Sequence, residues 1–349
     1  MIIKIKLLMK IKSVDIVSSN NIARSCNVVF SEYISKKAFN NLNLGDVNVY
    51  DSGDNFVLYK TVNFELNEND IIFTTHFFLK DLISKLNKVN KLKNIKLVTH
   101  WSDDSVDKKL FELKPPCVSE WYGINVNYEH PNLIPIPLGI AGDFSTKNLL
   151  ANEFTNLETR SSKENLLYVN FQKNTNNDER TDIAQIFDDK KWALVKEPNL
   201  SLSEYREDLS KSSFVLCPYG NGFDTHRLWE TLYAGSVPIV KKHLTFKTLA
   251  NLPVLFVDDF NQIDYELLTK TYNQIKQKSY DYSKLTVGYW VSIFNSNKIS
   301  SDNLQVLHFK KLEEVKSKIK YKANKYFYRY KKRIDFRINQ LKKFKFFII

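Results

Sequence analysis

Short apolar runs alternate with polar or helical stretches along most of the chain. In the first part, runs rich in β-branched and aromatic residues predict strands at residues 14–17, 47–50, 56–59, 71–75 and 96–100. After the fourth run, the apolar residues Phe78, Leu82 and Leu86 recur at the helical period and predict a helix over residues 77–92. Strands separated by helices are typical of a parallel α/β sheet, whose ligand crevice lies beyond the carboxyl ends of the strands.

The second part of the chain repeats this alternation. It predicts strands at residues 166–171, 194–196, 214–217, 236–240 and 254–257, and a helix that begins at Arg180. Residues 148–164 are polar and lack a period, which is typical of a linker. A chain of 349 residues is long enough for two domains. We therefore expect domains at residues 1–147 and 163–300, followed by a helical tail at residues 301–349.

The segment from residue 213 to residue 241 predicts a strand, a loop, a helix and a second strand. Two glycines in the loop allow positive φ and the close approach of a ligand. Asp224 is the expected N-cap of the helix, and Gly235 is the expected residue after its end. A glycine loop that opens a helix can bind an anion, because free N–H groups face the ligand. An ordinary α/β unit without a ligand accounts for the same residues equally well.

Two charged residues of this helix are candidates for binding chemistry. Arg227 and Glu230 are three positions apart, so both side chains can reach one pocket. An arginine there suits phosphate oxygens, and a carboxylate there suits sugar hydroxyls.

Three runs in this segment resemble the donor site of a known enzyme family. They are Cys217-Pro218-Tyr219-Gly220-Asn221-Gly222, Asp224-Thr225-His226-Arg227-Leu228-Trp229-Glu230 and Ala234-Gly235-Ser236-Val237-Pro238-Ile239-Val240. Together they resemble exostosin-type glycosyltransferases, close to the branch of ribitol xylosyltransferase-like proteins, and are more distantly similar to α-1,3-fucosyltransferases. The resemblance implies a GT-B architecture, in which two Rossmann-like domains face a cleft. It also implies transfer from a nucleotide-sugar with inversion, without a metal or another cofactor.

The resemblance assigns roles to residues of the second domain. It implies a donor site at Gly220, Asn221 and Gly222, with positive charge for the diphosphate from Arg227, Arg180 and Lys173. It further implies that Glu230 binds ribose or sugar hydroxyls and that Asp224 or His226 orients the donor. An exposed loop charge is an equally good interpretation of Lys173.

The acceptor side is expected after the strand at residues 96–100. A Thr-His-x-Ser-Asp segment similar to this one, Thr99-His100-Trp101-Ser102-Asp103, occurs in the exostosin-like branch. An inverting transfer needs a base for the proton of the acceptor hydroxyl. Asp103 is the first candidate, and His100 and Asp104 follow it. Capping of the next helix by Asp103 and Asp104 is an alternative of equal weight.

The end of the chain carries the whole net charge of the protein. Residues 310–349 contain fifteen lysines and arginines against three acids, and the net charge of the protein is +12. Interleaved aromatic residues predict a basic amphipathic helix that binds an anionic membrane surface. Nucleic acid is a competing partner that we do not expect, because the charge is confined to one end. A solvated helix is the remaining alternative.

The cysteines and the first residues bear on location. Three cysteines without a metal or disulfide spacing favour a reducing compartment. Lysines interrupt residues 1–12, which predicts an edge strand or a basic amphipathic lead-in rather than a signal peptide. We therefore expect a cytoplasmic protein, peripheral on the inner face of a membrane.

The sequence thus predicts a hexosyl- or pentosyltransferase that acts on a glycan or lipid-linked acceptor. A catalytically inactive, glycan- or membrane-binding relative is one alternative. A nucleic-acid-binding protein that uses its basic tail is a weaker one.

Overall fold

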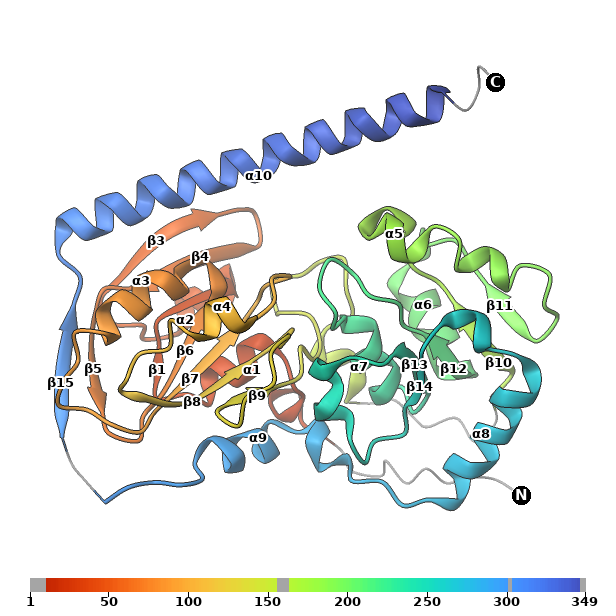
Figure 1. The fold of residues 1–349 in the computed structure, drawn as a ribbon, viewed down its shortest axis with the longest axis horizontal. Helices are drawn as coiled ribbons and strands as arrows, with labels where there is room; N and C mark the ends of the chain where they lie inside the picture. The colour runs from red at the N-terminus through yellow and green to blue at the C-terminus, as the bar shows by residue number, and fades with distance from the viewer. Residues whose placement is uncertain (1–10, 156–162, 301–302, 346–349) are drawn as a thin grey trace.

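The chain folds into two α/β units that lie side by side, and a long helix runs along one edge (Figure 1). The structure is a computed structural model that describes residues 11–155, 163–300 and 303–345. The lead-in expected at residues 1–12 therefore lies almost wholly outside the described residues, as does most of the second half of the expected linker. Before that gap, Leu149 and Phe154 are buried in the core of the second unit.

A five-stranded parallel sheet forms the centre of the first unit. Its strands, in spatial order, are β1 (Val28–Val29), β6 (Ile71–Thr75), β7 (Ile95–His100), β8 (Val118–Gly123) and β9 (Leu133–Pro135). Its helices are α1 (Ser19–Arg24), α3 (His76–Leu86) and α4 (Lys108–Phe111). The predicted helix over 77–92 ends early, because the chain turns at Asn87 and Lys88. Val89 and Leu92 then reach the core from an irregular segment.

A second sheet of the first unit is antiparallel, which the sequence did not predict. It pairs β2 (Ser31–Ser35), β4 (Phe56–Thr61) and β3 (Val47–Ser52), and α2 (Lys36–Asn41) follows β2. The predicted strands at 47–50 and 56–59 therefore exist, but a turn of residues 53–55 joins them, which is too short for a helical crossover.

The predicted strand at 14–17 is wrong. Ser13–Asp15 is a 3-10 helix, and Ile16 and Ser18 form only isolated bridges. The chain turns here because the Asn21 amide donates hydrogen bonds to the carbonyls of Ser13 and Ile16.

The second unit contains another five-stranded parallel sheet. In spatial order its strands are β11 (Ala193–Val195), β10 (Asn165–Val169), β12 (Ser212–Leu216), β13 (Val237–Lys241) and β14 (Leu255–Val257). The helices of this unit are α5 (Asn177–Arg180), α6 (Leu202–Lys211), α7 (His226–Tyr233) and α8 (Tyr265–Gln277). The chain leaves β10 for β11 on one side and then returns to β12 on the other side. Such a reversal is where a parallel sheet opens a crevice for a ligand.

After the second unit, the chain returns to the first. Helix α9 (Val287–Phe294) buries Trp290 and Phe294 beside Tyr122 of β8. Strand β15 (Leu304–His308) then pairs antiparallel with β5 (Asn63–Asn67). The elements between residues 287 and 308 therefore complete the first unit.

The long helix α10 (Lys311–Lys345) is anchored to the first unit at its beginning. The fully buried ammonium of Lys60 lies 2.5 Å from a carboxylate oxygen of Glu314. About two and three helical turns further on, Tyr321 and Lys325 both donate to the carboxylate of Asp51. We call residues 311–325 the root of α10. Beyond the root, the helix runs past the first unit (Figure 1). Within the described ranges, no helix is both long and apolar enough to cross a bilayer.

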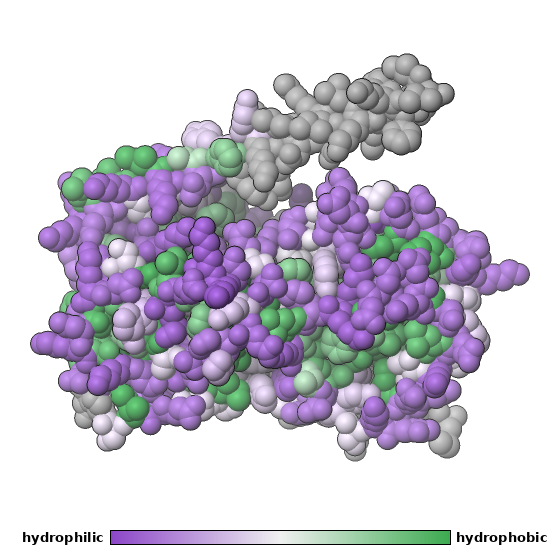
Figure 2. Space-filling view, in the orientation of Figure 1, coloured by the Kyte–Doolittle hydropathy of each residue, from purple (hydrophilic) through white to green (hydrophobic). Residues whose placement is uncertain are grey.

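The face shown in Figure 2 is mainly hydrophilic, with apolar patches between the charged groups. Near the start of α10, Leu312 and Ile319 are apolar and exposed. The main cores lie instead around the parallel sheets, as the burial of all six residues of β7 illustrates.

Candidate functional site

The reversal point of the second sheet is formed by the loops that follow β10 and β12. Arg180 ties the two loops together through three hydrogen bonds. Its Nε donates to the carbonyl of Tyr219 at 2.7 Å, its Nη1 to that of Gln172 at 3.1 Å, and its Nη2 to that of Pro218 at 3.1 Å. Within the described part of the chain, these bonds use three of its five N–H groups. The other two can face an anion.

Arg180 is the last residue of helix α5. The prediction that a helix begins at Arg180 is therefore wrong. The helix begins earlier because the Asn176 side chain caps it, accepting a hydrogen bond from the N–H of Glu179 at 3.2 Å. Burial and the neighbouring Arg227 lower the pKa of Arg180 to about 10, which leaves the guanidinium charged at neutral pH.

Arg227 and Glu230 lie on α7 and both contact Tyr205. Arg227 donates to the carbonyl of Asn170, the residue after β10, and its guanidinium lies 5.2 Å from the centre of the Tyr205 ring. Glu230 is buried and accepts a 2.7 Å hydrogen bond from the Tyr205 hydroxyl. Burial raises the pKa of Glu230. Burial also acts to lower the pKa of Arg227, but the neighbouring Tyr205 and Glu230 outweigh it, so the pKa of Arg227 is raised. The three side chains form one network.

Tyr205 was missed by the sequence reasoning. It lies on α6, whose first turn carries a capping box between Ser201 and Glu204. That capping box was a readable signal for a helix beside α7, although it does not indicate which side chain faces Arg227.

Asp224 does not cap α7, and that prediction is wrong. Thr225 occupies the N-cap position, and the Asp224 carboxylate turns away to bind other donors. It accepts from the backbone N–H of Leu138 at 2.8 Å and from the indole N–H of Trp229 at 2.9 Å. Burial raises the pKa of Asp224 to about 7. The residue therefore joins α7 to the segment after β9, and His226 does so as well, since its Nδ1 lies 2.8 Å from the carbonyl oxygen of Gly139.

The loop glycines act by close approach rather than by positive φ. Among the described glycines, positive φ occurs at Gly45, Gly139 and Gly235, and not at Gly220 or Gly222. A Cβ on Gly222 would lie 2.5 Å from the side-chain nitrogen of Asn125, which follows β8 in the first unit. The same Asn125 accepts a hydrogen bond from the N–H of Asp224 at 2.9 Å. The glycine loop is therefore packed against the first unit.

The candidate base Asp103 lies at this contact between the units. It is exposed, and its carboxylate accepts a 3.1 Å hydrogen bond from the side chain of Asn221 in the glycine loop. Asp104 lies 3.8 Å from the imidazole of His76. Asp107 caps α4, so the alternative in which Asp103 or Asp104 caps the next helix is wrong.

His100 is buried beneath this loop with both ring nitrogens engaged. Its Nε2 lies 3.2 Å from the carbonyl oxygen of Pro137, and its Nδ1 accepts from the N–H of Trp101 at 2.9 Å. Burial lowers the pKa of His100 to about 3, so the ring is neutral at physiological pH. These contacts join the loop after β7, at Trp101, to the segment after β9, at Pro137.

Lys173 lies at the outer edge of the site. Its side chain is 47% exposed and pairs with Glu197 at 3.4 Å. Around the site and elsewhere among the described residues, no three His, Cys, Asp or Glu side chains are grouped so that they could hold a metal ion.

A family comparison identifies the class of this protein. Residues 143–312 match the family described as the RXYLT1 C-terminal domain, where RXYLT1 is the exostosin-like ribitol xylosyltransferase 1. The match supports assignment to the glycosyltransferase class. Residues 143–312 thus carry a domain of the exostosin-like, ribitol xylosyltransferase-type family, which supports the resemblance seen in the sequence. A search of curated proteins found no match.

The matched segment contains every donor-side candidate and none of the acceptor-side candidates. Lys173, Arg180, the glycine loop, Arg227 and Glu230 all lie inside it. His100 and Asp103 lie before its first residue. Their roles in catalysis stay predictions.

Proposed function

We propose that the protein is a GT-B glycosyltransferase that moves a sugar from a nucleotide-sugar to a hydroxyl of a glycan or lipid-linked acceptor. One observation carries the proposal: Arg180, Arg227 and Glu230 converge at the reversal point of the parallel sheet in the family-matched segment. The loops after β7 and β8 face this point from the first unit, which supports a cleft between two Rossmann-like halves.

The donor diphosphate would bind at the two arginines. Arg180 has N–H groups left over after holding the loop carbonyls, and Arg227 lies beside it. Two fixed cations stabilise the charge of a leaving diphosphate, which is the work that a metal ion does in other enzymes. Glu230 and Tyr205 would bind ribose or sugar hydroxyls, and Lys173 would contribute from the edge. No cofactor besides the nucleotide-sugar is then required.

Asp103 is the proposed base of an inverting displacement. It would take the proton of the acceptor hydroxyl as that oxygen attacks the anomeric carbon, while the bond to the diphosphate breaks. Its hydrogen bond to Asn221 puts the carboxylate against the glycine loop, as this role requires. His100 would act as a positioning residue, since both of its ring nitrogens are engaged.

An inactive relative is the second candidate function, and one observation favours it. Arg227, Glu230 and Tyr205 already satisfy one another without a ligand. A donor must therefore displace or extend this network, whereas an inactive glycan-binding protein could keep it as a structural brace.

Nucleotide binding distinguishes these two candidates. Thermal unfolding is measured with UDP, GDP, CMP and dTDP, with and without Mn²⁺, on the native chain, on Arg227→Ala and on the surface control Lys190→Ala. We expect one nucleotide to raise the melting temperature regardless of metal, and Arg227→Ala alone to abolish the shift. Turnover of the matching nucleotide-sugar should fall by about 100-fold in Arg227→Ala. Unchanged turnover would refute the donor site, and no shift with any nucleotide would favour the inactive relative.

The end of α10 would hold the enzyme on an anionic membrane surface, at the cytoplasmic side. The sequence after residue 325 contains eight lysines and arginines and one acid. Each cation near an anionic bilayer contributes about 1 kcal/mol. Cys26, Cys117 and Cys217 are all free thiols in the structure, which supports a reducing compartment. Lipid-linked acceptors would be reached from such a surface.

A further inference from the structure

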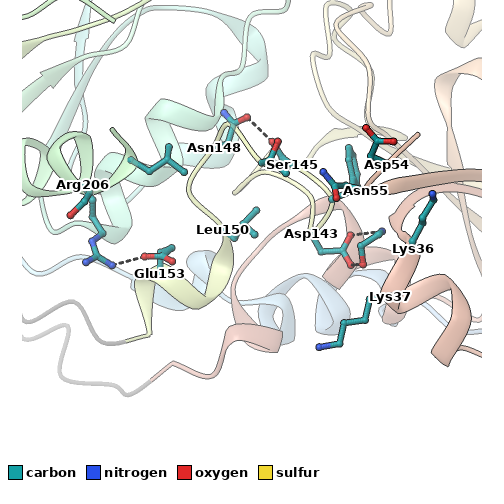
Figure 3. Close-up of a pocket in the computed structure, with 15 residues that line it drawn as sticks. Lys36, Lys37, Asp54, Asn55, Asp143, Ser145, Asn148, Leu150, Glu153 and Arg206 are labelled. Carbon is teal, nitrogen blue, oxygen red and sulfur yellow. Dashed lines mark hydrogen bonds and ion pairs between the residues drawn. The ribbon is translucent and has the colours of Figure 1, made fainter. Parts of the chain in front are cut away.

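A pocket of about 830 Å³ lies between the two units and is separate from the arginines of the proposed donor site. From the first unit it is lined by the start of α2, the turn between β3 and β4, and the segment around Phe144. From the second unit it is lined by the start of α6, including Arg206. Figure 3 shows these residues on opposite sides of the pocket. A pocket of this size holds a ligand of several rings.

Aromatic side chains connect the pocket to the candidate base. The ring of Phe144 lies 4.8 Å from that of Trp101 and 5.9 Å from that of Tyr33, and Phe56 completes the group at 6.4 Å from Phe144. We call these four residues the aromatic wall. Each of them is partly exposed rather than buried in a core. Trp101 precedes Asp103 by two residues, so the wall extends from the pocket to the loop that carries the proposed base.

The backbone is strained at the wall. Trp101 has φ of 58°, in the left-handed region that bulky residues rarely adopt. A residue held in such a conformation costs on the order of 1–3 kcal/mol, and such residues cluster at ligand sites. Gly142 shows a second local requirement, because a Cβ there would lie 2.6 Å from the Phe144 ring. The absence of a side chain at Gly142 thus lets the Phe144 ring pack against the backbone at Gly142.

The charges that line the pocket largely cancel. Arg206 pairs with Glu153 at 2.5 Å, and Asp143 accepts hydrogen bonds from the N–H and hydroxyl of Ser35. Lys36, Lys37 and Asp54 are the other charged groups of the lining. The remaining polar lining consists of hydroxyls and amides, namely Asn55, Ser145, Thr146, Asn148 and Ser203. Such groups suit a ligand with many hydroxyls better than one with a concentrated charge.

We propose that this pocket and the aromatic wall bind the acceptor, and that the acceptor presents an uncharged oligosaccharide there. The apolar face of one sugar ring would stack on Phe144, which lines the pocket and packs edge to face against Trp101, because an aromatic ring offers a large flat surface at low cost in entropy. The hydroxyls of the following rings would bind the amides and hydroxyls of the pocket. The hydroxyl to be glycosylated would then reach Asp103. The assignment of this ligand as an acceptor rests on the proposed function, but binding itself does not require turnover.

Saccharide binding tests the proposal directly. The full chain is titrated with xylotriose, cellotriose, mannotriose and chitotriose, and with oligogalacturonate as a charged counterpart. Binding is followed by saturation-transfer NMR and by tryptophan fluorescence. The variants are Phe144→Ala, Phe144→Leu and Trp101→Phe, and the matched control is Tyr265→Ala, an aromatic residue of α8 that is 58% exposed. Phe144→Leu keeps apolar bulk if the alanine variant fails to fold.

We expect at least one uncharged trisaccharide to bind, and Phe144→Ala or Phe144→Leu to weaken binding by about tenfold, a loss typical of one stacked ring. Tyr265→Ala should bind as the native chain does. Binding by none of the uncharged trisaccharides, stronger binding of oligogalacturonate, or equal affinity in Phe144→Leu would overturn the proposal. If a saccharide binds but no nucleotide raises the melting temperature, the proposed transferase function would be refuted while the proposed saccharide site would be supported.

Discussion

Asp224 is a buried carboxylate that joins the two units, and its environment makes its charge costly. It accepts from Leu138 of the first half and from Trp229 of α7, and burial raises its pKa from 3.8 to about 7. The folded protein therefore prefers the protonated form. Between these two values the folded state holds a proton that the unfolded state releases, so stability falls as pH rises through this range. The shift corresponds to at most about 4 kcal/mol.

Asp224→Asn should remove this pH dependence. The oxygen that accepts from Leu138 also lies 3.0 Å from the Trp229 nitrogen, so one amide oxygen can serve both donors. We expect the native chain to lose free energy of unfolding between pH 5 and pH 8, and the variant to lose at least about 1 kcal/mol less. Urea unfolding at both pH values measures this, with the exposed Asp15→Asn as the control. Parallel profiles for Asp224→Asn and the native chain would contradict the assignment.

Local spacing reveals residues that act together within one helix, and it does not reveal partners from distant segments. Arg227 and Glu230 both contact Tyr205, in keeping with side chains three positions apart that point the same way. Asp224 was misassigned because its oxygens can bind any N–H, and the one they bind at Leu138 is 86 positions away. The role of Asn125 against Gly222 was missed for the same reason.

Helix α7 owes its position to its ends. At its C-terminus, Gly235 has φ of 67° and donates to Leu232, while Ser236 donates to Thr231 at 3.0 Å. These two bonds form a Schellman motif, which turns the chain directly into β13. The sequence predicted this end correctly, because glycine is the residue that adopts the left-handed conformation without strain.

A pair of glycine substitutions tests the contribution of this turn. Gly235→Ala should lower the free energy of unfolding by about 1 kcal/mol, because alanine must adopt the left-handed region. Gly288→Ala, in the first turn of α9 with open space around its Cα, should raise it by about 0.5–1 kcal/mol. Chemical denaturation of both variants is the measurement. Equal effects at the two positions would show that the backbone conformation of Gly235 is not what stabilises the end of α7.

Buried parallel strands were the elements most readable from the sequence. Strands β6, β7, β10, β12 and β13 each appear as an apolar run, because both faces of these sheets are covered. The antiparallel strands β3 and β4 gave the same local signal, and their pairing depends on partners that a local pattern does not specify. Strands β1 and β2 were missed, and β1 is only two residues long.

At the scale of the whole molecule, α10 has a root that is packed against the first unit and a basic segment that follows it. The root, residues 311–325, is held by Glu314, Tyr321 and Lys325 through their contacts with Lys60 and Asp51. A chain that ends at Lys325 should therefore unfold at the same temperature as the full chain. It should lose most of its binding to vesicles that contain phosphatidylserine, because the eight cations after residue 325 are gone.

Co-sedimentation with vesicles of different phosphatidylserine content measures this difference. Neutral vesicles serve as the control, and added salt should weaken binding of the full chain. Undiminished binding of the shortened chain would refute the membrane-binding role of the residues after Lys325.

The pairing of β5 with β15 has a consequence for how the protein folds during synthesis. Residues 63–67 find their strand partner at residues 304–308, and the entire second unit lies between them in the chain. At about 5–20 residues per second, a ribosome needs roughly 10–50 s to cover that interval. During this time β5 is an open edge, ready to pair with other extended chains. The first unit is thus started first and completed last, when β15 emerges and pairs with β5.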